Sequence, residues 1–276
     1  MFTIGLACSI ESYEMGTKSA HKKKFLAEHP LCCFCGGGVP SSELDHVPSR
    51  VFFASSQWPE GFVFPACARC NRATRHDEQV VAMLSWMYPD PTTNKGKAEV
   101  HERIRAVAHN YPKVLLEMQP SARQLRNAVK IYGMKRNPGQ SLSELPVLSA
   151  KGPLVNAAVE NFSRKLFCAL YYKHTKEILP KSGGIAIKWY SNVQIERDEI
   201  PRSIAPILPG FPKLERSRIN LDDQFFYRWG VEETKAEAAF LAFFRKSFAI
   251  VGYVNRDAND IELPANARIV RPYAYA

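Results

Sequence analysis

The sequence has no long apolar run. None of its 276 residues lies in a window approaching the roughly 18 apolar residues needed to cross a bilayer. The first ten residues form only a short apolar stretch with no preceding Lys or Arg, and Glu11 and Glu14 follow at once, which is unlike a secretory signal. Internal repeats and low-complexity tracts are also missing. These absences predict a cytoplasmic protein that does not enter a membrane.

Cysteine is scarce outside one segment. Of the seven cysteines, five lie between residues 32 and 70. Without a secretion signal we expect a reducing compartment, where disulfides are disfavoured and clustered thiols more often hold metal. The spacing Cys32-x2-Cys35 and Cys67-x2-Cys70 supplies four thiolates, the ligand set of many tetrahedral structural zinc sites. We therefore predict a structural zinc ion. Four buried free cysteines or a redox pair are the alternatives, although a redox pair would not explain the second CxxC.

Basic residues are concentrated in the middle of the chain. The net charge is +10, and residues 91–190 alone hold 17 Lys and Arg against 6 Asp and Glu. Residues 1–90 hold 8 against 9, and residues 191–276 hold 12 of each. Such asymmetry predicts a polyanionic partner, with nucleic acid the first candidate. A set of solvated helix faces is the simpler alternative.

The pattern of apolar residues and breakers predicts an α+β protein in several parts. Residues 1–14 precede a second methionine, Met15, and we expect a disordered extension there. The predicted parts are a small α+β module over 15–90, a basic helical region over 91–180 and an α+β region of unknown role over 181–276. Pro89 and Pro91 mark the first boundary, and the change of pattern after Pro180 marks the second.

Periodicity predicts the elements within these parts. Helices are expected over 18–28, from Ala68 to about Met87, and over 96–110, 113–118, 121–133 and 153–179. Strand-like runs occupy 51–53, 62–66, 185–193, 225–231 and 247–254, and residues 232–243 are expected to be a helix or a turn.

Between and just after the two cysteine pairs lie residues suited to phosphodiester chemistry. Asp45-His46 falls inside the insert, and Asn71 directly follows Cys70. A neutral His accepts a proton from water near pH 7, and carboxylate and amide oxygens are suitable ligands for a hard divalent ion. Arg50 and Arg72 are candidate phosphate contacts, although surface arginines are the commoner case.

The order of these motifs resembles the HNH endonuclease superfamily in its four-cysteine form. The resemblance covers about residues 18–85 and rests on FLAEHPLCCFCGG, LDHVPSR and FPACARCNR. It implies a zinc-stapled ββα-metal module in which His46 is the general base. It further implies that Asp45 and Asn71 hold a catalytic divalent ion such as Mg²⁺, with His76 the alternative helix ligand.

Two function hypotheses follow from the sequence. The first is a metal-dependent endonuclease that hydrolyses DNA in preference to RNA. The second is a catalytically inactive zinc-dependent module that only binds nucleic acid. The aromatic residues after position 180 could stack on bases, but we expect them to form a sheet core.

Overall fold

We describe the fold from a computed structural model of the chain. The structure describes residues 19–87, 94–145, 147–262 and 267–274, so the expected extension over 1–14 lies outside the described residues. Helices and antiparallel sheets share the chain, which confirms the predicted α+β class. No helix among the described residues is both long and apolar enough to cross a bilayer.

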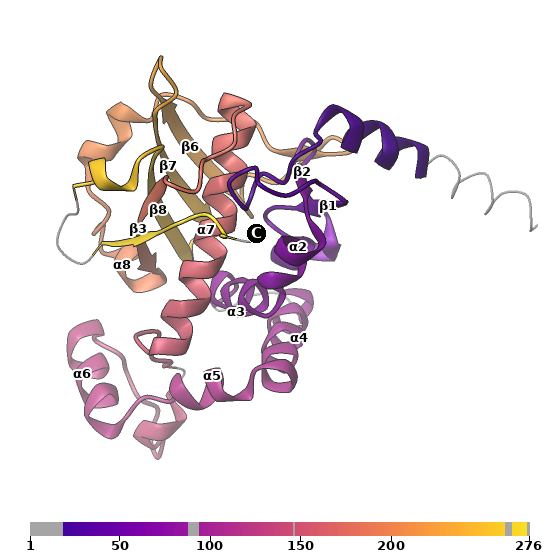
Figure 1. The fold of residues 1–276 in the computed structure, drawn as a ribbon. Coiled ribbons are helices and arrows are strands. Elements are labelled where there is room, and N and C mark those ends of the chain that lie inside the picture. Colours follow the sequence, from indigo (N-terminus) through magenta and orange to yellow (C-terminus); the bar gives the residue numbers. More distant parts are fainter. Residues whose placement is uncertain (1–18, 88–93, 146, 263–266, 275–276) are drawn as a thin grey trace, which may run out of the picture.

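The N-terminal part is a short hairpin followed by two helices (Figure 1). Residues 19–28 are helical, and the elements that follow are β1 (Glu43–His46), η1 (Arg50–Phe52), η2 (Ala54–Ser56), β2 (Val63–Ala66), α2 (Ala68–Ala73) and α3 (Arg75–Ser85). β1 and β2 pair antiparallel, with His46 opposite Val63. The strand predicted over 51–53 is wrong, because Arg50–Phe52 forms a 3-10 turn that buries Phe52.

The single helix predicted from Ala68 to Met87 is divided in two. Thr74 leaves the helical region, at φ −106° and ψ 7°, and separates α2 from α3. Its hydroxyl donates a hydrogen bond of 2.6 Å to Glu78, one turn into α3.

The middle of the chain is helical, as predicted. Its elements are α4 (Asn94–Asn110), α5 (Pro112–Glu117), α6 (Ala122–Tyr132), η3 (Leu142–Glu144) and α7 (Pro153–Thr175). The Glu117 carboxylate accepts the backbone N–H groups of Leu154 and Val155 at the start of α7. This carboxylate satisfies donors that a helix N-terminus otherwise leaves free.

The C-terminal part is built on a five-stranded antiparallel sheet. Its order is β6-β7-β8-β3-β9, with bounds β3 (Gly184–Ser191), β6 (Phe226–Val231), β7 (Glu237–Phe244), β8 (Phe248–Asn255) and β9 (Arg268–Val270). The other elements are α8 (Asn192–Glu196), η4 (Arg202–Ile207), η5 (Ala258–Asp260) and a small hairpin of β4 (Glu215–Arg216) and β5 (Ile219–Asn220). The helix or turn predicted over 232–243 is wrong from residue 237 on, because Glu237–Phe244 is a strand that pairs with β6 and β8, and only the residues before it form a turn.

Helix α7 lies between the sheet and the N-terminal part (Figure 1). Phe162 of α7 stacks on Phe52 with ring centroids 4.8 Å apart and also contacts Phe244 of the sheet. On the sheet side, a Cβ at Gly252 would collide with the Phe167 ring, so this glycine lets β8 approach α7 closely. One continuous apolar core therefore runs from the cysteine-rich segment to the sheet.

Candidate functional site

The four predicted cysteines converge on one point. Cys32 and Cys35 lie in the turns before β1, Cys67 is the N-cap residue of α2, and Cys70 lies inside that helix. All four are buried, and their sulfur atoms lie within 4.8 Å of one another. A tetrahedral zinc site with Zn–S bonds of about 2.3 Å places its sulfurs roughly 3.8 Å apart, so the group fits such an ion.

The turn that presents the first pair depends on glycine. Gly36 and Gly37 have φ of +70° and +72°, a region that other residues avoid. A Cβ at Gly36 would also lie 2.9 Å from the backbone nitrogen of Lys181. The glycine run after Cys35 therefore has a direct structural role.

The four thiols lie close enough to hydrogen-bond to one another. Hydrogen bonds from the Cys35 and Cys70 thiols lower the pKa of Cys32, which favours a thiolate, the form that binds metal. Cys33 is not part of the group, and burial raises the pKa of its thiol well above the ordinary value. The structure thus separates the four cysteines that could hold a metal ion from their neighbour Cys33.

Asp45 lies in a buried charge cluster that the sequence did not suggest. Its Oδ2 lies 2.7 Å from the Lys165 ammonium of α7, which also contacts Glu78 Oε1 at 2.8 Å and Thr74 Oγ1 at 3.0 Å. Lys165 is 1% exposed and Asp45 is 6% exposed. Burial is the main reason that the pKa of Asp45 rises to about 7, and the Lys165 charge only partly offsets it.

This cluster does not fit a divalent ion at Asp45. The ammonium lies at hydrogen-bond distance from the carboxylate, where an ion bound to Asp45 would have to compete with it. Among the described residues, the four cysteines are the one group of three or more His, Cys, Asp or Glu side chains that could hold a metal ion. No chemical step is therefore assigned to a divalent ion at Asp45.

Asn71 and His76 have other partners in the structure. The Asn71 amide donates to Glu43 on β1, and Arg72 Nη2 lies 3.7 Å from the same carboxylate. His76 is exposed and stacks on Tyr111, with ring centroids 6.2 Å apart. Asn71 is thus bonded to Glu43, a residue that sequence reasoning did not single out, and its predicted role as a metal ligand stays a prediction.

His46 lies in a different environment from Asp45. It is half-buried at the end of β1, and its ring lies 4.5 Å from the Trp58 ring in a perpendicular orientation. Its Nε2 accepts a hydrogen bond of 3.3 Å from Arg50 Nη2, because a guanidinium can only donate. Burial, followed by the positive charges of Arg50 and Arg216, lowers the pKa of His46 to about 4. The imidazole is therefore neutral at pH 7.

Five exposed basic residues of the middle region lie on α6 and the turn after it, and the others are spread over α4, α5 and the ends of α7. Arg123, Arg126, Lys130, Lys135 and Arg136 are all exposed. The one acidic residue between 111 and 143 is Glu117, whose carboxylate is used at the start of α7. This surface lies at the other end of the molecule from β1 (Figure 1), so it does not supply the positive charge next to His46.

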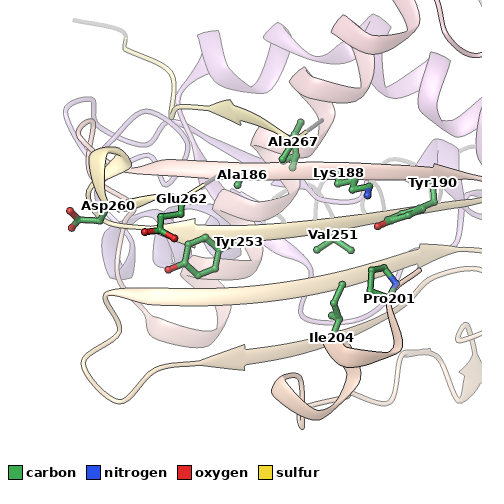
Figure 2. A pocket seen from close by; sticks show the side chains of 11 residues that line it. Ala186, Lys188, Tyr190, Pro201, Ile204, Val251, Tyr253, Asp260, Glu262 and Ala267 are labelled. Carbon is green, nitrogen blue, oxygen red and sulfur yellow. The ribbon is translucent and has the colours of Figure 1, made fainter. Parts of the chain in front are cut away.

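A cavity of about 550 Å³ lies elsewhere, on the sheet face turned away from α7. Figure 2 shows Lys188 and Tyr190 of β3 beside Val251 and Tyr253 of β8, with Ile204 of η4 across the cavity. None of the predicted site residues lines it. The cavity is therefore separate from the surface around His46.

Comparison with known proteins gives no relative. No family model matches the chain, and no curated protein or solved structure is significantly similar to it. Function must therefore be inferred from the residues and their geometry.

Proposed function

We propose that the protein hydrolyses phosphodiester bonds of nucleic acid at His46, with zinc on the four cysteines holding the hairpin and α2 together. The observation that carries the proposal is a neutral, half-buried imidazole bonded to a guanidinium at the end of a cysteine-stapled hairpin. The local motifs also resemble HNH endonucleases. DNA is proposed over RNA on that resemblance alone.

Arg50 and His46 would work together. In the structure His46 Nε2 is occupied by the Arg50 N–H. A bound phosphate would attract the guanidinium, since charge-assisted bonds to phosphate are stronger than a bond to a neutral ring. Nε2 would then be free to accept a proton from water as the general base.

The reaction balances with water as the second substrate. The water oxygen forms a bond to phosphorus while His46 takes one of its protons. The bond from phosphorus to the leaving oxygen breaks, and that oxygen takes a proton from solvent. The products are a phosphomonoester and an alcohol. Arg50 would stabilise the charge that develops on the phosphate oxygens.

The α6 surface supports a nucleic-acid partner. Its five exposed cations lie close together in the sequence and can contact backbone phosphates without reading sequence. Because α6 lies far from His46, a substrate that touches both must be long enough to follow the molecule between them. We therefore expect long duplexes to bind more tightly than short ones.

The test is a cleavage assay on plasmid DNA, run with and without added magnesium or manganese. We expect His46→Ala to lower the rate at least 100-fold, in the range typical of a lost general base. Zinc content and the thermal unfolding curve should remain those of the wild type. Normal cleavage by this variant would rule out His46 as the base.

A second candidate function is favoured by the Asp45–Lys165 pair. An ammonium bonded to the predicted metal ligand is what a module that has lost metal-dependent cleavage would show. The protein would then be a zinc-stabilised nucleic-acid-binding module. Tight DNA binding by the wild type, without cleavage under any metal condition, would favour this candidate.

A further inference from the structure

Two arginines from distant parts of the chain meet at Trp58, beside His46. The Arg50 Cζ lies 3.8 Å from the centroid of the Trp58 ring, and the Arg216 Cζ lies 4.0 Å from it. The two guanidinium carbons are therefore less than about 8 Å apart. Charge-assisted N–H···O bonds to phosphate are about 2.7–2.9 Å long, so a phosphate at the edge of the Trp58 ring, where the indole does not separate the two groups, is within reach of both.

Arg216 is held in this place by its hairpin. The backbone N–H of Glu60 donates to Glu215 O at 2.9 Å, and the N–H of Ser217 donates to Glu60 Oε1 at 3.0 Å. Ser217 and Arg218 both have positive φ, as the two central residues of a tight hairpin turn require. The β4–β5 hairpin is thus bonded to the loop that carries Trp58.

The two guanidinium groups lack a carboxylate partner in the part of the chain that the structure describes. The nearby Glu215 pairs with Lys213, and Glu60 accepts the bond from Ser217. Two like charges within about 8 Å of each other repel, the Trp58 ring offsets part of this repulsion, and an anion that contacts both groups would offset more of it. The arrangement is therefore suited to an anion, and both arginines can bind it through paired donors.

We propose that Arg50 and Arg216 form a binding site for one backbone phosphate diester of the nucleic acid, next to His46. The inference rests on the proposed function and extends it to the C-terminal part, which supplies Arg216. Trp58 orients the two guanidinium groups, and the substrate does not need to stack on it. The anion site is thus built jointly by the cysteine-stapled hairpin and by the β4–β5 hairpin.

The experiment compares Arg216→Gln, Arg216→Lys and Arg218→Ala in the full chain. Arg218 is the matched control, because it is exposed and lies on the turn of the same hairpin. Binding of a short fluorescein-labelled DNA duplex is measured by anisotropy at several salt concentrations without divalent ions, and cleavage is measured separately. Zinc content and thermal unfolding verify the fold of each variant.

We expect Arg216→Gln to weaken binding about tenfold. It should also reduce the slope of log binding constant against log salt concentration by about 1, which corresponds to the loss of one phosphate contact. Arg216→Lys should bind within threefold of the wild type but cleave at least tenfold more slowly, because an ammonium cannot form paired bonds to the phosphate. Arg218→Ala should change both readouts less than twofold.

The outcomes separate this inference from the proposed function. If the wild type does not cleave but Arg216→Gln still binds more weakly than Arg218→Ala, the anion site stands and the nuclease proposal fails. If the wild type cleaves and the two variants behave alike, the anion site is wrong and the nuclease proposal stands. Displacement of the duplex by inorganic phosphate at concentrations at which dimethyl phosphate, a diester, does not displace it would identify a site for free phosphate and overturn the diester assignment.

Discussion

Replacement of Lys165 by Met tests the buried charge cluster between α7 and the N-terminal part. The ammonium contacts Asp45 at 2.7 Å and Glu78 at 2.8 Å, and all three side chains are less than 10% exposed. Removing one partner of a buried ion pair typically costs 3–5 kcal/mol, because a charge is left without compensation; we expect about 4 kcal/mol here. A loss of this size is a large part of a typical unfolding free energy of about 5–15 kcal/mol.

The loss should depend on pH in a defined direction. Burial already raises the pKa of Asp45 from its ordinary value to about 7, and loss of Lys165 would raise it further. A carboxyl group whose pKa is raised by folding destabilises the protein as pH rises above the unfolded value of about 4. The variant should therefore be more strongly destabilised at pH 8 than at pH 5.

Urea unfolding of Lys165→Met and wild type at pH 5 and pH 8 measures both quantities. Lys151→Met, at an exposed position just before α7, is the matched control and should change stability by less than about 0.5 kcal/mol. Adding Asp45→Asn and Glu78→Gln to Lys165→Met should restore much of the loss, since no carboxylate remains unpaired. A loss below about 1 kcal/mol, or an equal loss at both pH values, would refute the reasoning.

Two further predictions concern the metal group and the base. Cys35→Ser should abolish binding of one zinc ion per chain and expose the N-terminal part to protease, whereas Cys33→Ser should retain the zinc. Equal zinc content in both variants, measured by mass spectrometry, would contradict the assignment of the zinc ligands. If His46 is the base, the cleavage rate should rise with pH only through about 4 and stay level to pH 8, because burial and the two arginines keep the ring neutral above that value. An acid limb near pH 6.5, measured as kcat/KM against pH, would refute a depressed pKa at the active base.

Much of the fold could be predicted because its signals are local. The 3.6-residue pattern of α7, the alternation in β3 and β8, and the two CxxC spacings each depend on residues close in sequence. The alanine-rich segment around Ala238 and Ala239 was ambiguous because its composition favours a helix. Pairing with β6 and β8 decides its conformation, and that pairing is a tertiary effect.

The candidate site was less predictable because its neighbours come from far along the chain. Asp45 and His46 could be singled out by their motif, but nothing near them indicates Lys165 or Arg216. In the sequence, Lys165 is one of many cations in the basic helical region. Its burial follows only from the packing of α7 between the N-terminal part and the sheet. The roles assigned to His46, Asp45 and Asn71 remain predictions.

The spacing of these residues along the chain also matters during synthesis. Arg216 follows His46 by 170 residues, and Lys165 follows Asp45 by 120. A ribosome that has finished the cysteine-rich segment has therefore made a chain in which Asp45 has no cation and His46 has only one of its two arginines. The site is completed only when the β4–β5 hairpin has left the exit tunnel and packed against the Trp58 loop. A truncated product that ends before residue 216 would therefore lack one of the two arginines that lie beside His46.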